Sequence, residues 1–155
     1  VTGMSGTGKS TVLGELAREG YRVVDTDEDD WSEEVPLADG SGFEQLWRED
    51  LMDALLAEDG DGPLFVSGCA TNQSSFYDRF EAVVLLSVPT AVLLERIAAR
   101  TNNPFGKDPA ERDRILEDLA TVEPGLRRSA TVEISTDRPL SDVVEIVEAL
   151  AGPWS

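Results

Sequence analysis

A run of small and polar residues near the start of the chain has the spacing of a loop that holds phosphate groups. The run extends from Gly3 to Thr11 and has the pattern G-x-x-x-x-G-K-S. Its glycines let the backbone turn back, so that successive N–H groups point inward at an anion. Lys9 can reach the β- and γ-phosphates of a nucleotide, and the Ser10 hydroxyl can ligate Mg²⁺. The residues expected to contact the nucleotide in this run are Gly3, Ser5, Gly6, Thr7, Gly8, Lys9, Ser10 and Thr11.

Carboxylates follow the next apolar segment at the position where a parallel strand would end. Residues 22–25 predict a short strand that leads into Asp25 and Asp27. Ligands of open α/β sheets bind at the carboxyl ends of the strands. Carboxylates there can hold Mg²⁺, orient a substrate hydroxyl or accept its proton. We assign Asp25 to the metal together with Ser10, and Asp27 or Asp25 to the acceptor hydroxyl.

Five of the 13 lysines and arginines gather around one polar loop. They are Arg96, Arg100, Lys107, Arg112 and Arg114. In an acidic chain this clustering predicts a lid, over about residues 100–112, that closes on the phosphates and stabilises charge in the transition state. Arg100 and Lys107 would then neutralise the moving phosphoryl group. The alternative is an ordinary helix-loop-helix whose arginines pair with the acids beside them.

The composition limits the class of protein. The chain has 155 residues, 41% of them hydrophobic and 28% charged, which predicts one globular domain over residues 1–155. A formal net charge of −18 argues against nucleic acid as the main partner. No apolar run is long enough to span a membrane. The single cysteine, Cys69, excludes an internal disulfide and suits a reducing cytoplasm. The absence of histidine excludes histidine-based triads.

The elements that must position these residues follow from apolar periodicity. Strands are predicted at 22–25, 64–67, 82–88 and 130–135, after a first strand that ends at Val1–Thr2. Helices are predicted at 9–19, 90–100, from Asp108 onward and at 140–151. Ser41 and Glu44 have the spacing of a capping box, which predicts a further helix from there to about Glu58.

Three residues are candidates for the acceptor side. Arg48, the only basic residue of the helix predicted before Glu58, either faces the substrate or pairs with one of the acids around it. Gly68 and Cys69 follow the third strand, where small residues allow a ligand to approach closely. Cys69 fits a packed small hydrophobe better than a nucleophile. Trp31 and Trp47 fit the core better than a substrate wall.

The order of these parts resembles the nucleoside-monophosphate-kinase-like small-molecule kinases, and over the first thirty-odd positions the shikimate kinases. The resemblance rests on the phosphate loop, on Asp25-Thr26-Asp27 after the second strand, and on the arginine-flanked lid. It implies a three-layer α/β fold with helices on both faces of a five-stranded parallel sheet of order 2-3-1-4-5. It also implies that Asp25 and Asp27 hold the acceptor hydroxyl and help to place Mg²⁺.

The same resemblance carries two further sites. The lid arginine of these kinases corresponds to Arg100 or Arg96. The loop that contacts adenine corresponds to residues 136–140, with Asp137, Arg138 and Pro139 at its centre.

Departures from the shikimate kinases leave the acceptor open. Those enzymes have three successive glycines where this chain has Ser67-Gly68-Cys69, and Arg48 does not cleanly match their arginine-glutamate pattern. The sequence therefore predicts a cytoplasmic phosphotransferase that uses ATP (or another NTP) and Mg²⁺ on a hydroxyl of a small molecule, as a monomer or homodimer with no membrane or nucleic-acid partner. The alternative is a regulatory ATPase that acts on a partner protein without a small acceptor.

Overall fold

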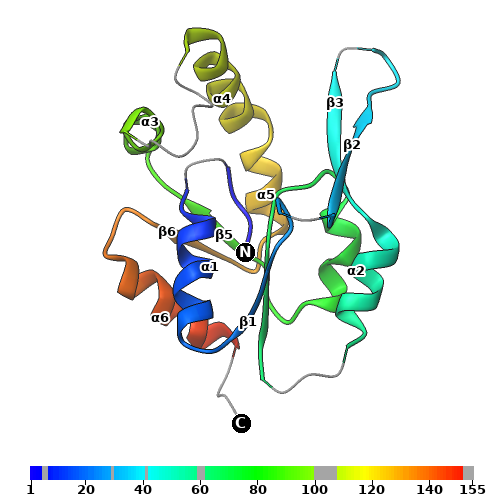
Figure 1. The fold of residues 1–155 in the computed structure, drawn as a ribbon. Helices are drawn as coiled ribbons and strands as arrows, with labels where there is room; N and C mark the ends of the chain where they lie inside the picture. The colour runs from blue at the N-terminus through cyan, green and yellow to red at the C-terminus, as the bar shows by residue number, and fades with distance from the viewer. Residues whose placement is uncertain (5–6, 29, 41, 59–61, 100–107, 152–155) are drawn as a thin grey trace.

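The computed structural model describes residues 1–4, 7–28, 30–40, 42–58, 62–99 and 108–151. Parallel strands lie at the centre of the fold with helices around them (Figure 1). The strands are β1 (Arg22–Asp25), β2 (Ser32–Pro36), β3 (Phe43–Trp47), β4 (Leu64–Ser67), β5 (Val84–Ser87) and β6 (Val132–Ser135). The helices are α1 (Lys9–Arg18), α2 (Glu49–Leu56), the 3-10 helix η1 (Gln73–Arg79), α3 (Thr90–Ala99), α4 (Pro109–Thr121), α5 (Glu123–Ser129) and α6 (Leu140–Ala151).

Two parallel strand pairs form the centre of the fold. β1 pairs with β4, and β5 pairs with β6. Val1 and Thr2 lie between the pairs: the Val1 nitrogen donates to the Val66 carbonyl at 2.8 Å, and the Thr2 N–H donates to the Val84 carbonyl at 2.8 Å. The α/β class with parallel strands is therefore as predicted. The complete five-strand order stays a prediction, because the first segment contributes a single bridge, from Thr2 to Leu85.

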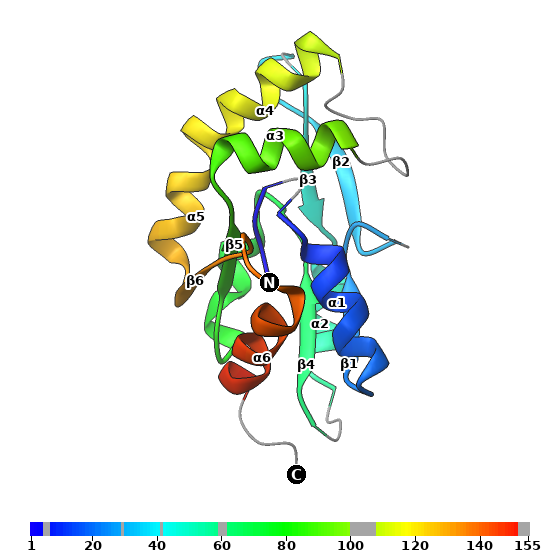
Figure 2. The ribbon, with the colours of Figure 1, turned by 90° about the vertical axis from the view of Figure 1, so that its left-hand side faces the viewer.

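Apolar clusters hold the helices against the strands. Figure 2 shows α1 and α6 close together on one face, where they share a core with β4, β5 and β6. The buried members of that core are Val12, Leu13, Leu16, Phe65, Val84, Leu86, Ile134, Val143, Val144 and Val147. A second cluster around Trp47 and Met52 joins α2 and η1 to β4. Leu93, Ile97 and Ile115 pack α3 against α4.

The helix predicted from Ser41 to Glu58 is wrong over its first part. Ser41 lies outside the described residues, and residues 43–47 form β3, which pairs antiparallel with β2 from Ser32↔Trp47 to Pro36↔Phe43. The helix begins only at Glu49. Tertiary partners explain the strand, because the Asn72 side chain bonds both the N–H and the carbonyl of Trp47, at 2.8 and 3.0 Å. These bonds and the pairing with β2 outweigh the local helical pattern.

The other predicted helices are present. Gly20, with φ 96°, follows α1, and the Asp108 side chain accepts the Glu111 N–H at 2.9 Å at the start of α4. Helices α5 and η1 were not predicted from the sequence. Among the described residues, no helix combines the length and the apolar character needed to cross a bilayer.

Candidate active site

The phosphate loop turns on two glycines. Gly3 has φ 151° and Gly8 has φ 98°, in the region that side-chain-bearing residues rarely adopt. A Cβ on Gly3 would lie 2.5 Å from the Leu86 carbonyl oxygen and 2.8 Å from the Thr7 hydroxyl. The buried Thr7 hydroxyl donates to the Met4 carbonyl at 2.8 Å, which ties the two sides of the turn together. Helix α1 begins directly after Gly8, so its N-terminal N–H groups face the turn.

The Lys9 side chain folds back over this turn. Its Nζ donates to the Gly3 carbonyl at 2.6 Å and to the Met4 carbonyl at 3.2 Å. Burial lowers the pKa of Lys9, and nearby Cys69, Asp27 and Asp25 oppose that shift. A phosphate can replace these carbonyls as the partner of the ammonium group. Lys9 is therefore placed to bind the end of a triphosphate.

Ser10 and Asp25 are in direct contact. The Ser10 hydroxyl donates to Asp25 Oδ2 at 3.1 Å, and the Asp27 N–H donates to Asp25 Oδ1 at 3.0 Å. A hydroxyl and a carboxylate are oxygen ligands of the kind that Mg²⁺ prefers. The described residues contain no group of three or more carboxylate, cysteine or histidine ligands. The pair therefore fits an ion that takes its other ligands from nucleotide phosphates and water, as Mg²⁺ commonly does.

Asp27 faces the hairpin formed by β2 and β3. The Gln45 side chain donates through Nε2 to Asp27 Oδ1 at 3.3 Å and to the Ser32 hydroxyl at 2.8 Å. Sequence reasoning missed Gln45, because it assigned this residue to a helix. The signal that could have found it is the Asp39-Gly40 pair a few residues before this strand, which is typical of a hairpin turn.

Gly68 is packed tightly behind the same edge. A Cβ there would lie 1.9 Å from the Thr26 hydroxyl and 3.3 Å from Trp47 Nε1. The Thr26 hydroxyl donates to the Ser67 carbonyl at 2.8 Å and accepts from Trp47 Nε1 at 2.9 Å. The close approach at Gly68 is thus made by Thr26, and Trp47 is a core residue as predicted.

The loop predicted to contact adenine is tied to the phosphate loop. Arg96 donates to the Thr136 hydroxyl at 2.9 Å and to the Thr136 carbonyl at 2.7 Å. The Thr136 hydroxyl in turn donates to the Thr7 carbonyl at 2.8 Å. The exposed residues 137–139 follow directly. Arg96 therefore ties the segment between β6 and α6 to α3, and Thr136 ties it to the phosphate loop.

The remaining predicted residues are more dispersed. Arg48 is exposed and precedes α2, and Thr11 is exposed on α1. Cys69 is half-buried, and burial raises the pKa of its thiol, so it stays protonated and fits the packing role. The predicted residues Ser5, Gly6, Arg100 and Lys107, with lid residues 100–107, lie outside the described residues.

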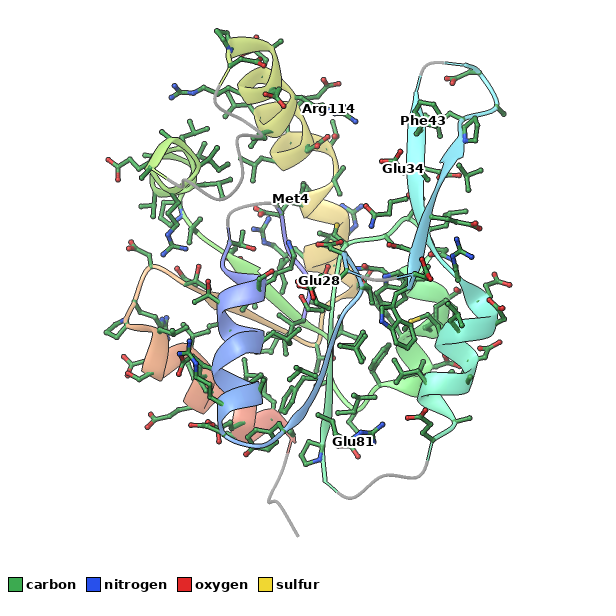
Figure 3. All side chains as sticks on the ribbon, viewed as in Figure 1. Met4, Glu28, Glu34, Phe43, Glu81 and Arg114 are labelled. Atoms are coloured by element: carbon green, nitrogen blue, oxygen red, sulfur yellow. The ribbon has the colours of Figure 1, made fainter. Side chains whose placement is uncertain are left out.

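Two elements rise beyond the phosphate loop. Figure 3 shows Arg114 on α4 and Glu34 on β2 above Met4, with Phe43 toward the far end of the hairpin. Phe43 is 63% exposed. A cavity of about 410 Å³ lies elsewhere, lined by Arg22, Glu58, Leu64, Phe80, Val84 and Leu150. None of the predicted site residues lines this cavity.

The loop geometry and the parallel strands together define the class: this is a phosphate-loop protein of the kinase-like α/β fold. Residues 1–117 match the model of the family described as "AAA domain", and the chain belongs to that family. Among curated proteins, none matches this chain.

Solved structures agree on the fold. The shikimate kinase from Acinetobacter baumannii in complex with shikimate is 19% identical, with a TM-score of 0.62 over 96% of this chain and 89% of that one. The shikimate kinase from Bacteroides thetaiotaomicron is 17% identical, with a TM-score of 0.64 over 96% of this chain and 94% of that one. At these identities the likeness establishes the fold, which confirms the resemblance expected from the sequence at that level.

Proposed function

We propose that the protein is an ATP- and Mg²⁺-dependent phosphotransferase that transfers the γ-phosphate to a hydroxyl group of a small molecule. The observation that carries the proposal is the convergence, at one sheet edge, of Lys9 on the phosphate loop and the Ser10–Asp25 contact, with Asp27 beside them. A phosphate-binding cation, a metal-binding oxygen pair and a further carboxylate are the parts that phosphoryl transfer to a hydroxyl requires.

Each residue has a defined part in this proposal. The loop amides and Lys9 bind the β- and γ-phosphates, and Ser10 with Asp25 would hold Mg²⁺, which neutralises phosphate charge when bound. Asp27 orients the acceptor hydroxyl and accepts its proton. Arg100 and Lys107 are assigned to the charge of the transferring group on sequence grounds. Because the transition state of such transfers is loose, positioning and electrostatics supply most of the rate.

The test is phosphate transfer to a panel of sugars, cyclic polyol acids, nucleosides and aminoglycosides, measured with a coupled assay of ADP release. We expect one class to stimulate ADP release and to yield a phosphorylated product. Asp27→Asn should lose transfer while it still binds Mg-nucleotide. Asp30→Asn, a change of an exposed carboxylate in the same acidic stretch, is the matched control and should retain activity.

Two results would contradict the proposal. ADP release that no acceptor stimulates would favour the regulatory ATPase instead. Equal loss of transfer in Asp27→Asn and Asp30→Asn would contradict a specific role of Asp27 in binding the acceptor.

The proposal also covers the strand order, the number of domains, the location and the oligomeric state. We infer that β1, β4, the Val1–Thr2 segment, β5 and β6 form one sheet in that spatial order. Hydrogen bonds on both sides of Val1–Thr2 support this arrangement. We also propose a single domain, a cytoplasmic location, and a monomer or homodimer whose ligands are a nucleoside triphosphate and the acceptor.

A further inference from the structure

Gln45 is the one hairpin side chain with a described hydrogen bond to Asp27. Its Nε2 lies 3.3 Å from Asp27 Oδ1 and 2.8 Å from the Ser32 hydroxyl oxygen. Asp25, by contrast, uses its two oxygens for the Ser10 hydroxyl and the Asp27 N–H. The two carboxylates of this edge therefore point to different neighbours, Asp25 to the phosphate loop and Asp27 to the hairpin.

The orientation of the Gln45 amide follows from its two partners. The Ser32 hydroxyl donates its only proton to the Thr26 carbonyl at 2.8 Å, so toward Gln45 it can only accept. The Asp27 carboxylate likewise only accepts. Both partners therefore require the amide nitrogen, whose two hydrogens are then used. The amide oxygen, Oε1, remains as an acceptor with no donor among the described residues.

The backbone of Gln45 is fixed from two sides. Across the hairpin it stands opposite Glu34 in the β2–β3 register. On its other side the Gln45 carbonyl accepts the Thr71 N–H at 2.9 Å, and Asn72 holds Trp47 two residues further along β3. The amide is thus presented to Asp27 from a backbone braced between a strand and the segment after β4.

Building on the proposed function, we propose that Gln45 positions Asp27 for the acceptor and selects acceptors that carry a second hydrogen-bond donor beside the hydroxyl to be phosphorylated. The Asp27 carboxylate and Gln45 Oε1 are neighbouring groups that only accept hydrogen bonds. A vicinal diol or an amino alcohol can donate to both. A carboxylate at the second position would meet an acceptor and leave the oxygen unpaired, which costs affinity.

The experiment uses the acceptor that wild-type protein phosphorylates best and its deoxy analogue without the neighbouring donor. Gln45→Met keeps the length of the side chain and removes both the donor and Oε1. We expect it to lower kcat/KM for the full acceptor by about 10- to 100-fold, as displaced reacting groups do. The KM for Mg-nucleotide and the thermal unfolding midpoint should stay unchanged. Wild-type protein should discriminate against the deoxy analogue by about tenfold, and this preference should vanish in the variant.

Glu33→Gln is the matched control, because Glu33 is exposed on the same hairpin and pairs with Leu46, which faces away from Gln45. It should retain the wild-type preference. If wild-type protein phosphorylates an acceptor but Gln45→Met leaves its rate and the deoxy preference intact, the inference fails while the proposed function stands. The inference also fails if the variant only unfolds more easily. If wild-type protein phosphorylates nothing, both fail.

Discussion

Replacing Gly68 by alanine tests the packing that holds the acceptor edge together. The new Cβ would lie 1.9 Å from the Thr26 hydroxyl, which cannot move away without breaking its bonds to the Ser67 carbonyl and to Trp47 Nε1. Overpacking of this kind costs about 1–3 kcal/mol, and each lost hydrogen bond about 1 kcal/mol. We therefore expect Gly68→Ala to lower the free energy of unfolding by about 2–4 kcal/mol.

A double-mutant cycle identifies the cause. Thr26→Ala alone removes the hydroxyl and leaves Trp47 Nε1 without its partner, at a cost of about 1–3 kcal/mol. In the Thr26→Ala background the Gly68→Ala change should cost much less, with a coupling energy of about 1–3 kcal/mol. Urea unfolding followed by tryptophan fluorescence measures all four proteins, because Trp47 is buried at this contact.

The matched control is Gly14→Ala. Gly14 lies in α1 with open space around its Cβ position, so alanine there should stabilise the protein by about 0.5–1 kcal/mol. Equal costs of Gly68→Ala with and without the Thr26 hydroxyl would refute the packing argument, whatever the size of those costs.

Three further changes test other parts of the structure. In Gly8→Ala the new Cβ meets no neighbouring atom, but alanine is forced into φ 98°. The change should lower the free energy of unfolding by about 1–3 kcal/mol and the thermal midpoint by about 2–4 °C per kcal/mol. An unchanged midpoint would contradict the positive φ at this position. Arg96→Met removes both bonds to Thr136, so the segment after β6 should lose its tie to the phosphate loop and nucleotide affinity should fall several-fold in a titration, and unchanged affinity would contradict this. The pKa of Glu133 is lowered by its bonds to Arg127 and to a serine hydroxyl, so its contribution to stability is complete above the usual glutamate pKa and is lost as the pH falls below it. Acid unfolding of Glu133→Gln should therefore depend less on pH below about 4.5 than that of wild-type protein, and parallel curves would contradict this.

The sequence predicts correctly those helices whose start or end depends on residues within the helix or next to it. Helix α1 follows from apolar spacing and ends at a glycine with positive φ, and Asp108 caps α4 as its side chain predicts. The Ser10–Asp25 contact was predictable too, because the phosphate loop and the end of the next strand meet at one sheet edge.

The hairpin was not predicted because residues 43–47 take their hydrogen-bond partners from other segments, which the pattern within these residues does not reveal. The spacing of Ser41 and Glu44 favours a helix, yet residues 43–47 find strand partners at 32–36 and at Thr71 and Asn72. Gln45 reached the site only through that pairing. The contact between Arg96 and Thr136 spans 40 residues, and no local pattern predicts it.

Calorimetric titration with Mg-ATP tests the central claim most directly, since everything proposed depends on a loop that grips phosphate. Wild-type protein should give saturable binding that weakens when Mg²⁺ is removed. Lys9→Met should unfold at about the wild-type temperature yet bind at least about tenfold more weakly, because it loses the ammonium group that crosses the loop. Absence of saturable binding in wild-type protein, or equal affinity in Lys9→Met, would contradict the account.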